Sequence, residues 1–172
     1  MDKHRNQFVF ETPLGWAGVA ASEQGICRLT LPKKDKKAVE RELKVFSSQN
    51  EKGSQTHALS KAVRLLQKYF SGKRVSFDLL LDTRSYTPFQ QAVWQAAAEI
   101  PSGETRSYAW IAKKIKNPRA VRAVGQALGA NPIPIIIPCH RVISSAGTLG
   151  GYAGGLLMKQ RLLELESRKG AR

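Results

Sequence analysis

The residues most able to do chemistry lie in one segment, 131–142, whose centre reads Pro138-Cys139-His140-Arg141. A cysteine acts as a nucleophile only as its thiolate, and a neighbouring imidazole or positive charge favours that form. Because His140 and Arg141 follow Cys139 directly, the segment predicts an activated nucleophile. The alternative is a buried, unreactive cysteine, which is the commonest fate of a free thiol.

Prolines constrain the backbone that carries this cysteine. Pro132, Pro134 and Pro138 exclude a regular helix or a central strand. We expect the chain here to run extended and buried, with rigid turns, and to deliver Cys139 to a fixed position.

A nucleophile and its base usually need a third group that orients the base. Residues 156–167 predict a terminal helix, and one of its faces is formed by residues at i, i+3, i+4 and i+7: Lys159, Leu162, Leu163 and Glu166. A carboxylate on an apolar stripe needs a partner. His140 is available, so Glu166 is the predicted orienting group. A solvated glutamate in a frayed last turn is the alternative.

The charge of the chain favours a polyanionic partner. Its 172 residues carry a net charge of +15, from 28 Lys and Arg against 13 Asp and Glu. Residues 105–163 contain no acidic residue but nine basic ones: Arg106, Lys113, Lys114, Lys116, Arg119, Arg122, Arg141, Lys159 and Arg161. A long stretch with basic residues and no acidic ones attracts nucleic acid and releases its counterions. General solubility is the alternative explanation.

Two short predicted helices form a helix-turn-helix candidate within this basic stretch. Ser107 can cap a helix over 108–116, which Asn117-Pro118 ends, and a second helix covers 119–128. The second helix is rich in Arg, Ala and Gly, so it could approach a DNA backbone closely while Arg122 reaches into the duplex. The same pattern also occurs in ordinary helical domains, where the arginine is merely solvated.

The remaining elements divide the chain into two predicted domains, 1–85 and 86–172. The first is a small α/β unit, with strands at 8–10, 15–20, 26–31 and 75–81 and helices at 38–46 and 57–70. The second is mainly helical and begins with a helix at Thr87-Pro88.

No cofactor, metal or membrane is expected. Cys27 and Cys139 are the two cysteines, the three histidines are scattered, and no cluster has the spacing of a zinc site. No window has the roughly 18 consecutive apolar residues of a membrane span. Residues 1–10 lack a signal peptide, so we expect a cytoplasmic protein, or a nuclear one in a eukaryote.

The motifs resemble one family, the O6-alkylguanine-DNA alkyltransferases. The resemblance runs in order over residues 87–167, and in the first domain it extends to length and element order. The motifs that carry it are Ser107-Tyr108, 119–125 (RAVRAVG), Asn131-Pro-x-Pro, 138–142 (PCHRV) and 151–155 (GYAGG).

The resemblance implies a ribonuclease-H-like α/β domain followed by a winged-helix-like domain with a helix-turn-helix. This motif would enter the minor groove of duplex DNA, and the damaged guanine would be flipped out of the stack. Arg122 matches the residue that fills the vacated space. Tyr108 matches the residue that pushes the 3′ phosphate and protonates guanine N3. Backbone-contacting positions are matched by Asn117, Ala123, Gly125 and Ser145.

The resemblance also implies a reaction, that of a methylated-DNA–protein-cysteine methyltransferase. Cys139 would accept the alkyl group from O6-alkylguanine, or less well from O4-alkylthymine, and would be consumed in one turnover. His140 would take the thiol proton through a water, with Glu166 holding the imidazole. Asn131 would brace the turn before the active-site segment. The lesion pocket would be formed by Val142, Tyr152, Ala153 and Gly154, with the carbonyls of Cys139 and Val142 reading the guanine amine and the backbone around Ala153 reading O6.

The sequence departs from the family pattern in places. Some members carry zinc in the first domain, but the needed Cys and His are missing here. Ala153 stands where some members have serine, and Gly154 leaves room for adducts as large as benzyl. We expect a monomer on DNA, with cooperative binding left open.

Three other functions compete with alkyl transfer. An alkyltransferase-like sensor would bind lesions without chemistry, but such proteins lack the acceptor cysteine. A helix-turn-helix regulator would need a dimerisation surface and a palindromic site. A thiol hydrolase or peroxidase would leave the acid-free basic stretch without a purpose.

Overall fold

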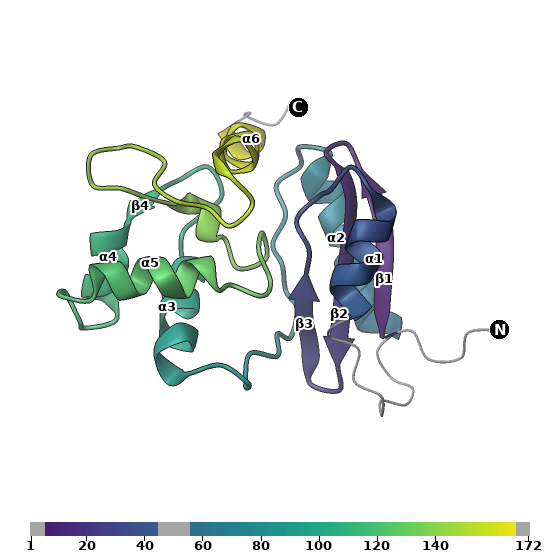
Figure 1. The fold of residues 1–172 in the computed structure, drawn as a ribbon, viewed down its shortest axis with the longest axis horizontal. Helices are drawn as coiled ribbons and strands as arrows, with labels where there is room; N and C mark the ends of the chain where they lie inside the picture. Colours follow the sequence, from purple (N-terminus) through teal and green to yellow (C-terminus); the bar gives the residue numbers. More distant parts are fainter. Residues whose placement is uncertain (1–5, 45–55, 168–172) are drawn as a thin grey trace. The chain divides into compact units, whose positions relative to one another are not determined.

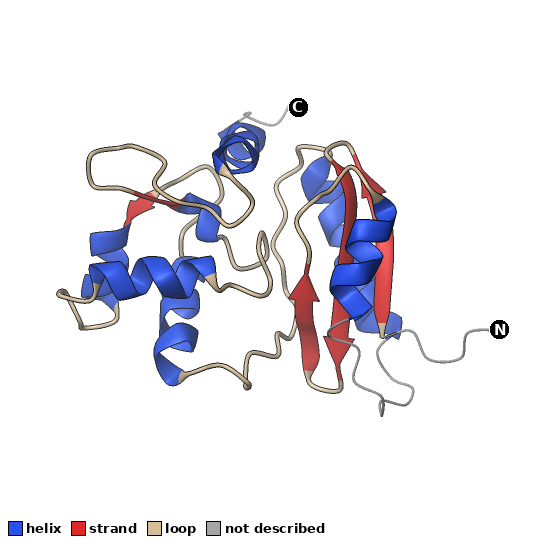
Figure 2. Cartoon of the chain, in the orientation of Figure 1, coloured by secondary structure: helices blue, strands red, loops and turns tan. Residues whose placement is uncertain are grey.

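The chain folds as two units, Met1–Thr83 and Arg84–Arg172. The computed structural model describes residues 6–44 and 56–167. Figure 1 traces the elements along the chain, and Figure 2 separates helices from strands. The first unit is α/β and the second mainly helical, as the sequence predicted.

Three antiparallel strands form the sheet of the first unit, in the order β1-β2-β3. They are β1 (Gln7–Thr12), β2 (Gly15–Ser22) and β3 (Gly25–Leu29). The strands predicted at 8–10, 15–20 and 26–31 are confirmed in position, although β1 and β2 extend beyond the predicted bounds and β3 ends two residues early. Gly25 begins β3 with a φ of +142°, and a Cβ there would lie 2.3 Å from the Leu80 carbonyl oxygen, so only glycine fits.

Helices cover both faces of this sheet (Figure 1). Residues 17–21 of β2 are all buried, and successive side chains of a strand point to opposite faces. Gly18 faces α1 (Lys36–Lys44), since a Cβ there would lie 2.5 Å from the Leu43 side chain. The other face packs against α2 (Thr56–Phe70). Both helices were predicted, although residues 45 and 46 of the first prediction lie outside the described residues.

The predicted strand 75–81 is wrong. Only Leu81 forms a β-bridge, with Ile26. Side chains from 75 to 80 do alternate between half-buried and exposed, which is the pattern that predicted a strand. Within this stretch the Leu79 N–H donates to the Phe77 carbonyl at 3.0 Å, which is a local three-residue contact and not a bond between strands.

The described residues of the second unit, 84–167, contain four α-helices: α3 (Pro88–Ala98), α4 (Tyr108–Lys114), α5 (Val121–Gly129) and α6 (Leu156–Ser167). The predicted start of α3 is confirmed by a capping box, in which Thr87 Oγ1 accepts from the Gln90 N–H at 3.2 Å and Gln90 Oε1 accepts from the Thr87 N–H at 3.0 Å. The Trp94 indole donates to the Ala127 carbonyl at 2.8 Å, which ties α3 to α5.

A tight turn joins α4 to α5. Ser107 caps α4 as predicted, since its hydroxyl accepts from the Trp110 N–H at 3.1 Å. Lys116 adopts a φ of +58° after the helix, a left-handed residue of the kind that commonly ends helices. The second helix begins at Val121 rather than Arg119, because residues 118–119 form a turn whose Ala120 N–H donates to the Asn117 carbonyl.

A short parallel strand pair was not predicted. Strands β4 (Arg106–Ser107) and β5 (Val142–Ile143) pair Arg106 with Val142 and Ser107 with Ile143. Two residues are too few to leave a periodic pattern in the sequence. The pair fixes the start of α4 beside the end of the cysteine segment.

Candidate active site

The segment 131–142 is buried, as predicted, but it is not extended. A bridge joins Pro134 to Ile137 around Ile135, whose φ is +74°, and one turn of 3-10 helix, η1, covers Cys139–Arg141. An extended buried chain would leave backbone amides without partners. The tight turns satisfy them locally: the Ile137 N–H donates to the Ile133 carbonyl at 2.9 Å.

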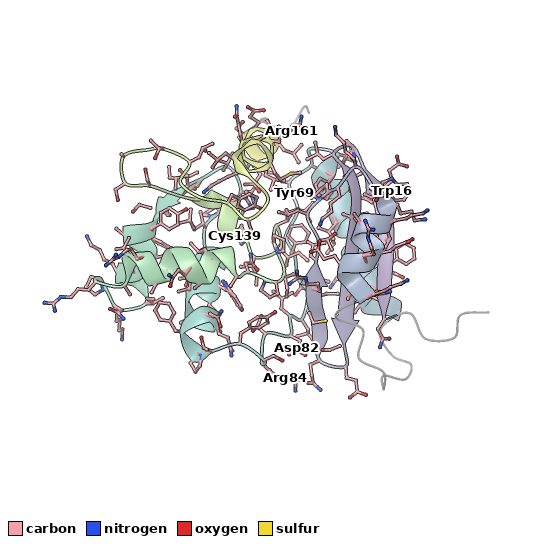
Figure 3. The ribbon with its side chains drawn as sticks, in the orientation of Figure 1. Trp16, Tyr69, Asp82, Arg84, Cys139 and Arg161 are labelled. Atoms are coloured by element: carbon pink, nitrogen blue, oxygen red, sulfur yellow. The ribbon has the colours of Figure 1, made fainter. Side chains whose placement is uncertain are left out.

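Cys139 lies in this turn (Figure 3). The residue is buried, with 6% of its surface exposed. The Asn131 amide Nδ2 lies 3.1 Å from the sulfur and also donates to the Ile137 carbonyl at 2.9 Å. The Ile133 N–H donates to the other amide atom, Oδ1, at 2.9 Å. One side chain therefore fixes both the turn and the sulfur.

The thiol keeps its proton in the resting protein. Burial raises the pKa of Cys139, and the opposing effects of Asn131, Tyr152 and Lys159 do not reverse the shift. Since the thiolate is the nucleophile, a reaction at this sulfur requires a base.

The next side chain along this turn, that of His140, belongs to a buried network. His140 is fully buried, and its Nε2 lies 2.7 Å from Glu166 Oε1. Its Nδ1 is buried and has no hydrogen-bond partner in the part of the chain that the structure describes. Glu166 stands on the inward stripe of α6, so the frayed, solvated alternative is wrong.

The carboxylate of Glu166 is held from two further directions. Arg141 donates from Nε to Oε2 at 2.8 Å and from Nη2 to Oε1 at 3.0 Å. The Gly103 N–H also donates to Oε2, at 3.3 Å. Burial would raise the pKa of Glu166, but the hydrogen bonds from His140 and Arg141 outweigh it and hold the pKa at about 2.

An ionised Glu166 determines the state of the imidazole. A carboxylate only accepts hydrogen bonds, so Nε2 carries the proton and Nδ1 of the neutral ring carries a lone pair. Burial lowers the pKa of His140, and Glu166 only partly opposes this. The ring is therefore a neutral base with an open acceptor atom.

Arg141 does not act where the sequence suggested. It was expected to favour the Cys139 thiolate, but its guanidinium binds Glu166 and the Ile100 carbonyl, the latter at 2.6 Å. The cation that lowers the pKa of Cys139 is Lys159 instead.

The contacts of Lys159 were not predicted from the sequence. It is fully buried on α6, and its ammonium donates to the carbonyls of Val142 at 2.6 Å, Gly151 at 3.2 Å and Leu149. Burial lowers its pKa to about 8, although Cys139 acts to raise it. Its place on the same stripe as Glu166 was the available signal.

Two tyrosines flank this lysine. The ammonium lies 5.8 Å from the centre of the Tyr108 ring and 6.0 Å from that of Tyr152. The Tyr108 hydroxyl donates to the Gly151 carbonyl at 3.3 Å. The buried Tyr152 hydroxyl makes no hydrogen bond of normal geometry, yet its interaction with Cys139 helps to lower the thiol pKa. Burial raises the pKa of both tyrosines.

The other predicted site residues lie outside the buried network. Gly125 brings α5 against Tyr108, since a Cβ there would lie 3.9 Å from the ring. Val142 is buried, and Ala123 is half-buried on α5. The exposed members of the predicted set are Asn117, Arg122, Ser145, Ala153 and Gly154.

Residues 6–44 and 56–167 hold no group of three or more His, Cys, Asp or Glu side chains that could bind a metal ion. Within the same ranges, no helix is long and apolar enough to cross a membrane.

Comparison with known proteins gives consistent matches over both units. Residues 8–83 match the ribonuclease-like domain of 6-O-methylguanine DNA methyltransferase, and residues 88–168 match its DNA-binding domain. The methylated-DNA–protein-cysteine methyltransferase of Methanosarcina barkeri is 48% identical over 92% of this chain and 94% of its own length. The constitutive methyltransferase of Bacillus subtilis is 46% identical over 91% and 92%.

Solved structures agree with these matches. The crystal structure of Mycobacterium tuberculosis OGT in complex with DNA superposes with a TM-score of 0.74 at 42% identity. The match covers 93% of this chain and 92% of that one.

Proposed function

The chain belongs to the 6-O-methylguanine DNA methyltransferase family and repairs DNA by alkyl transfer to a cysteine; from this premise, we propose that Cys139 is the acceptor. The observation that carries the proposal is the pairing of two buried groups on one turn. Cys139 has a sulfur held by Asn131, and His140 has an open Nδ1 and is clamped through Nε2 by Glu166.

In the proposed reaction, the Cys139 proton passes through a water molecule to His140 Nδ1. The thiolate attacks the alkyl carbon in line with the bond to guanine O6. A carbon–sulfur bond forms, the carbon–oxygen bond breaks, and its electron pair leaves with guanine. The thioether is stable, so each protein molecule reacts once.

Tyr108 is the proposed acid. Burial raises the pKa of its hydroxyl, so the group keeps its proton at neutral pH and can donate it to guanine N3. A protonated guanine is the better leaving group. Donation requires the hydroxyl to leave the Gly151 carbonyl, which it contacts at a long 3.3 Å.

The base is read by the backbone in this proposal. The carbonyls of Cys139 and Val142 accept from the guanine amine, and backbone near Ala153 contacts O6. Val142 already accepts from Lys159 at 2.6 Å, but a carbonyl oxygen has two lone pairs and can bind both donors. Tyr152 and the exposed Gly154 border a pocket that accommodates benzyl as well as methyl, and O4-alkylthymine reacts less well.

DNA binding is assigned to α4 and α5. The small residues of α5, Ala123 and Gly125, let the helix enter the minor groove, and the exposed Arg122 fills the space of the flipped guanine. Asn117 and Ser145 contact the backbone. The protein acts as a monomer in the cytoplasm, without a cofactor.

Intact-protein mass spectrometry tests the proposal. The wild type, Cys139→Ser and Cys27→Ser are each mixed with duplex DNA that contains one O6-methylguanine. We expect one added methylene on the wild type and on Cys27→Ser, none on Cys139→Ser, and no further turnover. Methylation of Cys139→Ser would contradict the assignment. Lesion binding without any mass gain would instead favour a sensor.

A benzyl adduct tests the pocket separately. Benzylguanine is expected to label the wild type at Cys139. Failure to label under conditions where methylguanine does so would exclude the roomy pocket and leave the acceptor assignment intact.

A further inference from the structure

Glu166 is shared by two neighbouring side chains of the same turn. His140 binds Oε1, while Arg141 binds both oxygens in a fork, at 2.8 Å and 3.0 Å. The side chains of His140 and Glu166 are 0% and 2% exposed, and that of Arg141 is 10% exposed. A proton relay needs only the first of these two contacts.

The fork changes the charge beside the imidazole. An unpaired carboxylate next to a buried histidine favours the protonated ring, because an opposite charge stabilises the imidazolium. An imidazolium has no lone pair and cannot accept a proton. With Arg141 in place, the Arg141–Glu166 pair is neutral as a whole. It therefore gives little electrostatic stabilisation to a protonated imidazole ring.

We propose that Arg141 is a positioning residue for alkyl transfer: by holding Glu166 in a fork it cancels the carboxylate charge, so that His140 is oriented by the carboxylate yet stays a neutral base with Nδ1 open. The inference rests on the proposed function of His140. It goes beyond it by assigning the charge state of the base to a residue outside the relay.

The surroundings of the ring agree with this role. Glu166 and Lys159 face it from α6, Arg141 follows it on the same turn, and Cys139 precedes it. Burial lowers the pKa of His140, Glu166 raises it, and Arg141 and Lys159 lower it again. Tyr152, near Cys139, keeps its proton and adds no charge, because burial raises its pKa.

The guanidinium is also fixed in place. Its remaining nitrogen, Nη1, donates to the Ile100 carbonyl beyond the end of α3 at 2.6 Å. A lysine could supply the charge but not the planar fork that contacts both carboxylate oxygens. Arg141→Lys keeps the positive charge but loses the fork, and Arg141→Gln loses the charge. The two variants therefore separate the effect of the charge from that of the fork.

Nitrogen-15 NMR of the histidine ring in the wild type is the first test, and it needs no substitution and no transfer activity. At pH 7 we expect a neutral His140 with its proton on Nε2. An imidazolium signal at pH 7 would overturn the proposal. Because this readout is independent of methylation, it separates failure of this inference from failure of the proposed reaction.

Single-turnover transfer rates between pH 5 and 9 are the second test, with Arg141→Gln, Arg141→Lys and the double variant Arg141→Gln/Glu166→Gln. Arg141→Gln should move the acid midpoint of the rate profile upward by about one pH unit or more. Arg141→Lys should lower the rate and leave the midpoint in place. The double variant, which removes both charges, should return the midpoint toward that of the wild type.

A purely structural role predicts a different pattern. Arg141→Gln would then lower the rate by one factor at every pH, with an unmoved midpoint, and this result would overturn the proposal. If Arg141→Gln does not fold, an imidazolium signal in the wild type or an upward shift of the Arg141→Lys midpoint would still overturn the proposal.

Discussion

The two units bury different kinds of polar side chain. In the described part of the first unit, the buried polar residues are Thr12 and Thr30, whose hydroxyls bond to nearby backbone. In residues 84–167 of the second unit they are all ionisable: His140, Arg141, Lys159 and Glu166. Charged residues of the first unit pair at the surface instead, as Lys33 does with Glu42 at 2.6 Å, with side chains 42% and 26% exposed.

The buried polar groups of the two units therefore differ in what their burial requires. Removing an ionisable group from water costs several kcal/mol unless it is paired and hydrogen-bonded. In the second unit Glu166 binds His140 and Arg141, and Lys159 donates to three backbone carbonyls. A threonine that satisfies a backbone amide carries no comparable penalty and does no chemistry. We expect substitutions of the buried ionisable residues in the second unit to have larger effects than substitutions in the first unit.

The largest expected effect is on the base. His140→Gln should slow transfer to Cys139 by about 100- to 10,000-fold, because positioned general bases contribute factors of this size. Quench-flow mixing with O6-methylguanine duplex, followed by mass spectrometry, measures the rate.

His57→Gln is the matched control, an exposed histidine on α2 of the first unit. It should transfer at the wild-type rate. A rate for His140→Gln within tenfold of the wild type would mean that the thiol loses its proton by another route.

The next effect is on acid stability. The pKa of Glu166 is about 2 in the folded protein, below the value near 4.3 of an unfolded chain. Its contribution is therefore present above pH 5 and is lost as the pH falls toward 2. It amounts to about 3 kcal/mol of unfolding free energy.

Urea unfolding of the wild type and Glu166→Gln at several pH values measures this contribution. The wild type should be more stable at pH 6, and the gap should close toward pH 2. Glu164→Gln, an exposed change on the same helix, should follow the wild type throughout. A constant gap for Glu166→Gln would contradict the linkage.

Much of the second unit could be predicted from the sequence. The spacing of 159, 162, 163 and 166 placed Glu166 on a buried face, because helical periodicity depends only on neighbours in the chain. The helix start at Thr87-Pro88 and the Ser107 cap were also predicted correctly, since capping is local. The motif order over 87–167 identified the family.

What failed required contacts between distant residues. Residues 75–80 alternate in burial as a strand would, but within 75–81 only Leu81 forms a β-bridge. Arg141 was assigned to Cys139 because it is adjacent in sequence, whereas its partner Glu166 lies 25 residues away. Lys159 was seen on the stripe, but its acceptors are carbonyls, and backbone acceptors leave no mark on residue type.

Lys159→Met tests the buried lysine of the second unit, whose contacts were not predicted from the sequence. It removes the donor shared by the carbonyls of Val142, Leu149 and Gly151, and should cost about 2 kcal/mol of unfolding free energy. Transfer should slow about tenfold, because a loosened pocket misplaces the reactants. Chemical denaturation and single-turnover kinetics measure the two effects.

The control is Lys61→Met in the first unit. Lys61 pairs with the 98% exposed Asp78 at 3.6 Å, so its loss should cost less than about 0.5 kcal/mol. Equal destabilisation by the two substitutions would remove the distinction between buried and surface lysines.

The smallest expected effect tests the first unit alone. The buried Thr30 hydroxyl accepts from the Gly18 N–H at 2.9 Å, and Thr30→Val leaves that amide without a partner at nearly constant volume. The expected loss is about 1 kcal/mol of unfolding free energy. Transfer by the folded variant should match the wild type, since no part of the proposed relay lies in this sheet. A slower reaction at full folding would mean that packing under β2 is coupled to Cys139, and the first unit would then have to be counted as part of the catalytic machinery.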